Sequence, residues 1–240
     1  MAKKKPTKNA EIKVPTAKPT HIRVKPEHIQ HVKLRQSQEK YSRTIEESDV
    51  TFCHGPAGTS KTFTACYTAL KMLAERKIQQ VVLCKPIQES GEKLGFLPGG
   101  IEDKMDPYMQ SYISNLKKIV GTEITERLIE REIIVFKPLA YMRGDTFDNC
   151  LMILDEAQNA TFKQLMLFIT RMGKKSKTLI TGDVSQYDIP KKSAGLPGFI
   201  KLMECINGVN NFAFTEDDIV RADILKKIVK KYDIWKSEND

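Results

Sequence analysis

The chain has 240 residues, of which 40% are hydrophobic and 29% are charged, as in globular proteins with a sizeable core. No apolar run approaches the roughly 20 residues that a membrane span needs, so we expect no membrane association. The N-terminus lacks the apolar segment of a secretory signal, and the five cysteines show no C-x-x-C spacing. These features predict a cytoplasmic protein with reduced thiols and no cysteine metal site.

The net charge of +9 is concentrated at the N-terminus. Residues 1–35 hold ten lysines and arginines against two glutamates, which leaves a net charge of about +1 for the other 205 residues. Residues 1–33 are also rich in Lys, Pro and Thr, and they predict a flexible tail before a folded domain over 34–240. Such a tail can hold nucleic acid through phosphate contacts, although a solvated leader without a partner is an equal alternative.

The first predicted elements surround a glycine-rich turn. A helix is predicted over 36–47, a strand over 50–53 and an apolar helix over 63–73. The segment Gly55-Pro-Ala-Gly-Thr-Ser-Lys-Thr62 lies between the strand and the second helix. Strand, glycine turn and helix in this order form a phosphate cradle, in which backbone N–H groups point at an anion.

This turn matches the pattern G-x-x-x-x-G-K-[ST] except that Ser60 stands where the second glycine is expected. Lys61 is predicted to reach the terminal phosphates, and Thr62 to offer its hydroxyl to Mg²⁺. Ser is common at helix N-termini and tolerates helical backbone angles, so we expect the loop to form with Ser60. A chance glycine turn is the alternative, which the strand and helix on either side disfavour. The predicted nucleotide contacts from this loop are Gly55, Pro56, Ala57, Gly58, Thr59, Ser60, Lys61 and Thr62.

Apolar strands alternate with helices along the rest of the chain. Strands are predicted over 80–84, 133–136, 150–154, 178–181 and 209–214, and helices over 102–131 with a break at Gly121, 161–172, 195–206 and 217–235; residues 86–100 read as a long loop. This alternation predicts an α/β fold with a parallel sheet covered by helices on both faces. Ligands of such sheets bind at the carboxyl ends of the strands. Gly55, Asp155 and Asp183 all follow strands closely, so we expect them to converge.

The polar residues at these strand ends suggest phosphate chemistry. Asp155 follows a wholly apolar strand and fits the role of the Mg²⁺ partner of a phosphate loop. Glu156 can orient the water that attacks the γ-phosphate or accept its proton, and Gln186 can sense that phosphate. Gln38, in the helix before the phosphate loop, can read the adenine edge. Ordinary surface or turn positions are the alternatives for both glutamines, and a solvated acidic strand end is the alternative for Asp155 and Glu156.

Three arginines are candidates for a finger that reaches a neighbouring subunit's site. Such a residue stabilises charge on the transferring phosphoryl group. Arg143 lies in a connection next to a glycine, Arg221 follows an acidic stretch, and Arg171 ends a predicted helix. A surface salt bridge is the alternative for each of them.

Five segments of the chain together resemble the PhoH-like family. They are Gly55–Thr62, Gly91–Gly99, Pro138–Gly144, Ile153–Asn159 and Thr181–Pro190. The likeness runs from about Leu34 to Trp235. It implies a single RecA-like P-loop core related to superfamily 1 helicases, ATP binding and assembly into a ring, commonly a hexamer. Some relatives are linked to RNA unwinding or RNA metabolism, and the family loop usually has Gly where Ser60 stands.

Two functions are consistent with these residues. The first is a Mg²⁺-dependent ATPase coupled to single-stranded RNA or DNA, helicase-like, with a second subunit completing the site. The second, prompted by Ser60, is a non-catalytic, nucleotide-gated oligomeric protein that binds RNA or directs assembly. The Asp-Glu-Ala-Gln sequence disfavours a small-molecule kinase, and the lack of an Asn-Lys-x-Asp guanine motif disfavours a GTPase.

Overall fold

The computed structural model describes residues 23–86, 101–184 and 193–220, together with Ile224, Ile228, Lys231 and Trp235. Side chains in the first turns of α3, up to residue 108, are not described. Most of the predicted loop over 86–100 lies outside these residues, as do Gln186, Arg221 and most of the predicted C-terminal helix. In the described part, no helix is both long and apolar enough to span a bilayer.

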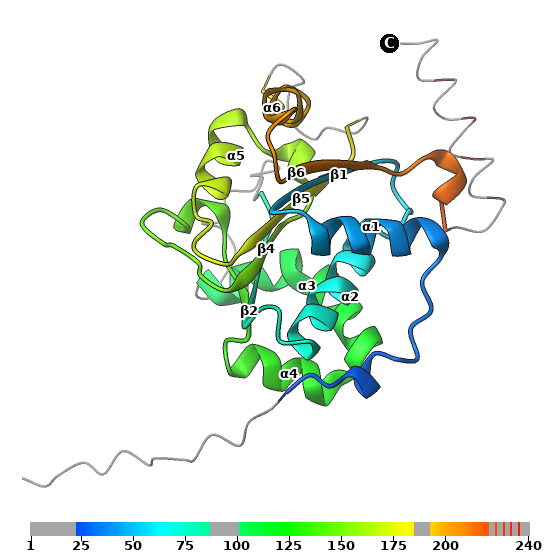
Figure 1. The fold of residues 1–240 in the computed structure, drawn as a ribbon, viewed down its shortest axis with the longest axis vertical. Helices are drawn as coiled ribbons and strands as arrows, with labels where there is room; N and C mark the ends of the chain where they lie inside the picture. The colour runs from blue at the N-terminus through cyan, green and yellow to red at the C-terminus, as the bar shows by residue number, and fades with distance from the viewer. Residues whose placement is uncertain are drawn as a thin grey trace, which may run out of the picture.

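Six parallel strands form one sheet in the order β3-β2-β4-β5-β1-β6 (Figure 1). Their bounds are β1 Val50–His54, β2 Gln80–Cys84, β3 Ile134–Phe136, β4 Cys150–Leu154, β5 Lys177–Gly182 and β6 Val209–Ala213. The strands β4, β5 and β1 are neighbours, and His54 pairs with Gly182 across β1 and β5. The ends of these central strands therefore meet at one edge, as the alternating sequence pattern predicted.

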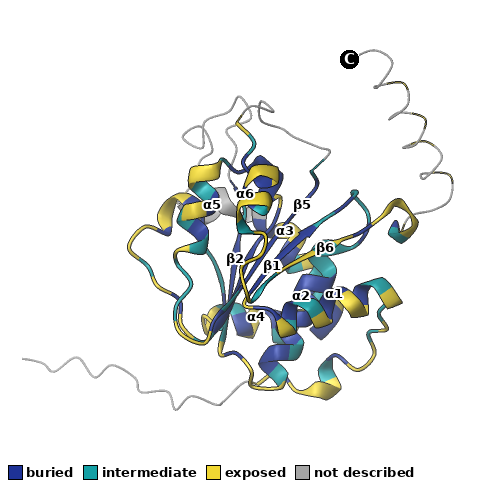
Figure 2. Ribbon diagram, turned by 45° about the horizontal axis from the view of Figure 1, so that its top comes forward, coloured by how far each residue is buried: buried dark blue, intermediate teal, exposed yellow. Residues whose placement is uncertain are grey.

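Helices cover both faces of the sheet (Figures 1 and 2). Their bounds are α1 Gln36–Glu47, α2 Lys61–Ala74, α3 Ile101–Val120, α4 Thr122–Glu130, α5 Phe162–Ile169 and α6 Leu196–Met203. One apolar core joins α1 to α4 to the sheet, and a second core joins α5 and α6 to its other face. Within β2, Val81 faces the first core and Val82 the second, because successive side chains of a strand point to opposite faces. This arrangement confirms the predicted α/β fold class.

Gly121 separates α3 from α4, as predicted. Its φ of 82° lies in the left-handed region, which a residue with a Cβ enters only at a cost. The chain therefore turns at this position, and α4 packs back against α3. The side chains of Tyr112, Leu116 and Ile119 in α3 are buried and belong to the core that this helix shares with α1, α2 and α4.

The folded part begins earlier in the chain than the predicted boundary at residue 34. Val24 and Ile29 are 2% and 6% exposed, and both belong to the core that α1 to α4 share. A short 3₁₀ helix, Pro26–His28, lies between them. Single apolar residues between prolines and charges show no helical or strand periodicity, which is why the sequence pattern placed residues 23–33 in the tail. That assignment is wrong for these residues.

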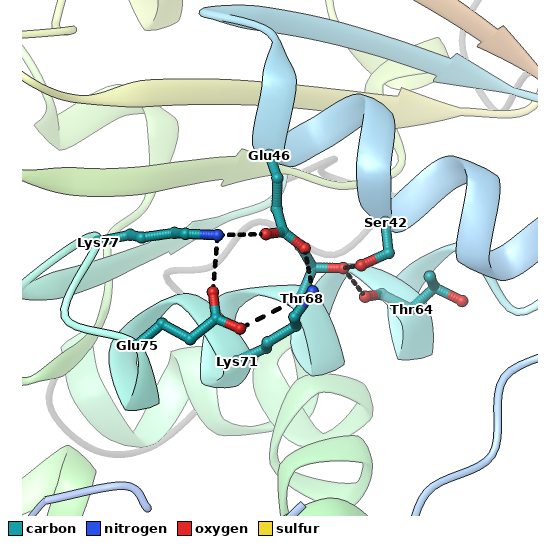
Figure 3. Close-up of polar contacts among 7 residues, drawn as sticks. All are labelled: Ser42, Glu46, Thr64, Thr68, Lys71, Glu75 and Lys77. Carbon is teal, nitrogen blue, oxygen red and sulfur yellow. Dashed lines mark hydrogen bonds and ion pairs between the residues drawn. The ribbon is translucent and has the colours of Figure 1, made fainter. Parts of the chain in front are cut away.

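A cluster of charged side chains fastens α1 to α2 and to the turn that follows α2 (Figure 3). Glu46 accepts hydrogen bonds from Lys71 at 2.6 Å and from Lys77 at 2.7 Å, and Lys77 also contacts Glu75 at 2.7 Å. Burial alone would raise the pKa of Glu46, but the bonds from the two lysines outweigh it and lower the pKa. The ionised carboxylate therefore stabilises the packing of α1 on α2.

Replacing Glu46 by Gln should lower the free energy of unfolding by about 1 kcal/mol near neutral pH, since hydrogen bonds to charged groups are removed and both lysines are partly exposed. The folded-state pKa of Glu46 is depressed, so its contribution is present above the unfolded-state pKa and is lost as pH falls through the folded-state value. Urea unfolding should therefore show that the difference in the free energy of unfolding between Glu46→Gln and wild type becomes smaller as the pH is lowered. Glu126→Gln, at an exposed ion pair with Lys117, is the control and should change stability by less than about 0.5 kcal/mol.

Candidate functional site

The turn between β1 and α2 contains two glycines with backbone angles that other residues adopt only at a cost. Gly55 has a φ of 149°, and a Cβ built on it would lie 2.7 Å from the Cβ of Phe214. Gly58 has a φ of 88°, and its carbonyl accepts a hydrogen bond from the Val220 N–H at 2.8 Å. Both positions thus require glycine conformations, and the segment after β6 holds the loop in place.

Lys61, the first residue of α2, folds back over this loop. Its Nζ donates to the carbonyl oxygens of Gly55 at 2.6 Å and Pro56 at 2.9 Å. The hydroxyl of Thr59 also donates to Pro56 O, at 3.0 Å. The loop therefore encloses one ammonium group next to the first N–H groups of a 14-residue helix, and both features favour an anion.

Ser60 does not have the helical backbone angles that we expected for it. Its φ of 63° and ψ of 32° are left-handed, and no hydrogen bond from its side chain caps α2. A left-handed conformation costs a residue with a Cβ about 1–2 kcal/mol, whereas glycine adopts it freely. The position where the loop pattern has glycine is therefore strained in this chain, and the prediction of relaxed angles at Ser60 is wrong.

Replacing Ser60 by Gly should raise the free energy of unfolding by up to about 1 kcal/mol. The relief of left-handed strain exceeds the extra chain entropy that glycine loses on folding. The same change should strengthen nucleotide binding if the strain at Ser60 opposes the bound geometry of the loop. Thermal unfolding and nucleotide titration of both forms measure these effects. Gly58→Ala introduces strain instead of relieving it, because φ at Gly58 is 88°. It should lower both the free energy of unfolding and the affinity for nucleotide.

Asp155 lies directly beyond the tip of β4, and its side chain is 3% exposed. Its Oδ2 accepts a 2.7 Å hydrogen bond from the Thr62 hydroxyl, and its Oδ1 accepts one from the Glu156 N–H at 3.0 Å. Burial and the neighbouring Glu156 carboxylate raise the pKa of Asp155, while Lys85 and the Thr62 hydroxyl act in the opposite direction. A cation bound here would favour the ionised form.

Glu156 projects from a strained turn and is exposed to solvent. Its φ of 56° and ψ of 36° are left-handed, a strain that is typical of functional sites. Gln158 donates to Glu156 Oε2 at 2.7 Å, and Gln158 Oε1 accepts from the Asp183 N–H at 3.0 Å. Gln158 therefore connects the tips of β4 and β5 and orients the Glu156 carboxylate. The sequence pattern did not single out this residue, although it stands in the same Asp-Glu-Ala-Gln segment.

One hollow of about 450 Å³ gathers the charged residues from three strand ends. Lys61 and Thr62 come from the start of α2, directly after the loop that follows β1. Asp155 and Glu156 come from the end of β4, and Asp183 from the end of β5. Its lining residues are Ala57, Gly58, Ser60, Lys61, Thr62, Phe63, Asn115, Asp155, Glu156, Gln158, Asp183 and Val220. The volume is in the range of small-molecule sites. The convergence expected from the sheet topology is present, and the individual roles stay predictions.

Among the predicted site residues that the structure describes, Gln38, Arg143 and Arg171 do not line this hollow. The Gln38 Oε1 accepts a hydrogen bond from the Arg35 N–H at 2.9 Å at the start of α1, so the structure gives this side chain a capping position. Arg143 is exposed in the connection between β3 and β4. Arg171 donates to the Asp145 carbonyl. Gln186 and Arg221 lie outside the described residues, but Val220 lines the hollow and brings the chain to its edge immediately before Arg221.

A larger hollow of about 750 Å³ lies between residues 32–34, α1 and α2. Lysine, arginine and glutamate side chains of both signs line it, and none of the strand ends contributes. It lacks the glycine loop and the hydroxyl–carboxylate pair. The smaller hollow at the strand ends is therefore the better candidate for phosphate chemistry.

The oxygen groups at the strand ends fit a magnesium ion. Thr62 and Asp155 supply a hydroxyl and a carboxylate at contact distance, which are the hard ligands that Mg²⁺ prefers. Among the described residues, no group of three or more His, Cys, Asp or Glu could hold a metal by itself. Magnesium in phosphate sites usually takes one or two protein ligands and completes its shell with substrate phosphates and water. This fold and this site define a P-loop nucleotide-binding protein.

Comparison with known proteins assigns the family. The family model described as PhoH-like protein matches residues 31–233, so the chain belongs to the PhoH-like family. A PhoH-like protein of Bacillus subtilis is 43% identical over 197 residues, which are 82% of this chain and 62% of that protein. A PhoH-like protein of Synechocystis is 40% identical, over 84% of this chain and 61% of that protein. The Escherichia coli protein PhoH is 32% identical, over 82% of this chain and 56% of that protein.

The chain spans less than two thirds of the length of these relatives. Among solved structures, it is similar to the large terminase ATPase domain of the Thermus phage P74-26, with 13% identity, a TM-score of 0.49 and coverage of 80% of this chain and 85% of that one. It is also similar to the Pif1 helicase from Candida albicans, with 14% identity, a TM-score of 0.40 and coverage of 77% and 40%.

Proposed function

We propose that the chain is a Mg²⁺-dependent ATPase. The observation that carries the proposal is the 2.7 Å contact between Thr62 and Asp155, which joins the phosphate loop to the end of β4 next to the Lys61 ammonium. The bound ion would supply charge neutralisation between the phosphates, with Thr62 and Asp155 as its protein ligands. The absence of an Asn-Lys-x-Asp sequence supports ATP rather than GTP.

In this proposal, different residues bind the phosphates and activate the attacking water. The N–H groups of the loop and the ammonium of Lys61 bind phosphate oxygens, which replace the carbonyls of Gly55 and Pro56 as partners of that ammonium. Glu156 orients a water molecule and accepts its proton, and Gln158 fixes the carboxylate for that step. Gln186 is proposed to sense the γ-phosphate, and the adenine contact of Gln38 stays a prediction.

The proposal extends to single-stranded nucleic acid, RNA in particular, and to a homo-oligomeric ring in the cytoplasm. The described residues form one RecA-like nucleotide-binding core, and helicases of this kind bind nucleotide between two such cores. We therefore propose that a second copy completes the site. Arg143 is exposed and Arg221 directly follows a residue that lines the hollow, so both are candidates to act on a neighbouring copy's phosphates. The basic N-terminus supports contact with nucleic acid phosphates.

A second candidate is a nucleotide-gated binding protein without meaningful turnover. The left-handed strain at Ser60 favours it, because a strained loop can hold nucleotide in a geometry that does not react. Phosphate release, measured with and without Mg²⁺ and single-stranded RNA or DNA, separates the candidates when oligomer mass is recorded on the same sample. Turnover that nucleic acid stimulates supports the ATPase. Nucleotide-dependent assembly without phosphate release supports the second candidate.

Deleting residues 1–22 should weaken binding to single-stranded nucleic acid and flatten its salt dependence. This segment holds six lysines and one glutamate, and its removal leaves the buried Val24 in place. For every phosphate that the shortened protein no longer neutralises, the slope of log K against log salt should fall by about 0.7. Basal ATP turnover should stay unchanged. Equal affinity and equal slope in the two proteins would show that this segment does not bind nucleic acid.

A further inference from the structure

Lys85, the first residue after β2, is a second cation at the site that the sequence motifs did not reveal. Its Nζ lies 4.0 Å from Asp155 Oδ2, the same oxygen that accepts the Thr62 hydroxyl bond. Only 13% of the Lys85 side chain and 3% of that of Asp155 are exposed to solvent. A charge pair this far from water is weakly screened, so the ammonium acts strongly on the carboxylate.

Two successive residues of α3 hold Lys85 in this position. The ammonium donates to the Ser111 hydroxyl at 2.7 Å and lies 5.2 Å from the centre of the Tyr112 ring. The Tyr112 hydroxyl in turn donates to the Cys84 carbonyl at 3.0 Å, in the residue before Lys85. Lys85 is therefore placed by packing and hydrogen bonding, and does not move as freely as a surface lysine.

The charges at the strand ends explain why a cation is needed there. Among the described residues that line the hollow, the carboxylates of Asp155, Glu156 and Asp183 outnumber the one ammonium group, that of Lys61. A nucleotide triphosphate brings further negative charge, and Lys61 already has partners on the loop. Lys85 offsets this excess of negative charge, because its ammonium lies next to Asp155 Oδ2, the oxygen that we assign to the metal.

We propose that Lys85 is a positioning residue whose ammonium competes with the metal ion for the Asp155 carboxylate. Through this competition, Lys85 couples metal binding to nucleotide binding. This inference rests on the proposed Mg²⁺–ATP site. With Lys85 in place, the ion alone binds weakly, because an ammonium already neutralises the carboxylate. Nucleotide without metal still binds, because that ammonium reduces repulsion between the phosphates and the acidic strand ends. Metal and nucleotide together outcompete Lys85 at Asp155 Oδ2.

The direct test replaces Lys85 by Gln, which removes the charge but keeps a donor for Ser111. Mn²⁺, a spectroscopic probe for the metal, is titrated without nucleotide by electron paramagnetic resonance. A fluorescent ATP analogue is titrated by anisotropy in excess EDTA and again in Mg²⁺. We expect Lys85→Gln to bind Mn²⁺ about tenfold more tightly and the analogue in EDTA about tenfold more weakly, with affinity in Mg²⁺ changed by less than about threefold.

Three further variants make the result specific. Lys85→Arg keeps the charge and should restore wild-type values in both titrations. Lys137→Gln is a matched control, since Lys137 pairs with Asp145 and lies 5.5 Å over the Phe147 ring away from the hollow. It should leave both affinities unchanged. Ser111→Ala removes the partner that holds the ammonium and should shift both affinities about threefold in the same directions as Lys85→Gln.

Thermal unfolding shows which variants are folded, and Ser111→Ala provides the test if Lys85→Gln is not. The inference would be overturned if Lys85→Gln and Ser111→Ala were folded and bound Mn²⁺ and the analogue as wild type does. It would also be overturned if Lys85→Arg or Lys137→Gln shifted both affinities as much as Lys85→Gln does. Wild-type protein that binds no nucleotide would instead contradict the proposed function, so the two failures can be distinguished.

Discussion

Replacing Glu156 by Gln should slow ATP turnover by at least about 100-fold while nucleotide affinity changes by less than about threefold. The amide has the shape of the carboxylate but cannot accept a proton, and loss of a general base typically costs 10²–10⁴-fold. Nucleotide binding should persist because the loop and Lys61 are unchanged. The amide oxygen of the new glutamine can still accept the hydrogen bond from Gln158. Steady-state phosphate release and anisotropy titration measure the two quantities separately.

The control for this experiment is Glu123→Gln, at a carboxylate that is 74% exposed and pairs with Arg127 on α4. Its turnover should equal that of wild type. If Glu156→Gln hydrolysed ATP as fast as wild type, another group would have to activate the water. If wild type itself released no phosphate under any condition, the nucleotide-gated binding protein would be the better account.

Replacing Lys61 by Ala should weaken ATP binding at least about 100-fold and leave no measurable turnover. This ammonium lies inside the loop, next to the N-terminus of α2, and donates to two backbone carbonyls, which we expect phosphate to replace. Interactions between a half-buried ammonium and phosphate are stronger than those at the open surface because less water screens them. Isothermal titration with Mg²⁺–ATP, together with phosphate release, provides the measurement.

Lys163→Ala on the exposed surface of α5 is the matched truncation and should bind ATP as wild type does. Because Lys61 begins α2, the unfolding transition of Lys61→Ala must also be recorded. A folded Lys61→Ala protein with unchanged affinity would mean that the phosphates bind elsewhere, and the assignment of the cradle would then be wrong.

Much of this fold could be predicted because its elements have strong local signals. The helix over 36–47 and the strands over 80–84 and 150–154 have the predicted bounds. Wholly apolar strands are typical of a parallel sheet that is buried on both faces. The apolar runs in the sequence therefore predicted a sheet with a layer of helices on each side. The convergence of Lys61, Asp155 and Asp183 on one hollow followed from the same topology, since parallel strands present their carboxyl ends at one edge.

What the sequence pattern missed depends on tertiary contacts. Val24 and Ile29 lie among prolines and charges, and only the packing of α1 to α4 gives them a core to join. Lys85 resembles any lysine after a strand until β4 places Asp155 beside it. The left-handed angles of Ser60 come from the loop geometry that glycine normally serves, and a serine in the sequence does not indicate them.

The most direct measurement is a crystal structure of the protein with Mg²⁺ and a non-hydrolysable ATP analogue. We expect the triphosphate in the hollow at the strand ends, with the loop N–H groups and Lys61 on its oxygens and the metal on Thr62 and Asp155. The Glu156 carboxylate should face the γ-phosphate. A nucleotide seated instead in the larger hollow between α1 and α2, with the loop at 55–62 unchanged, would contradict the account.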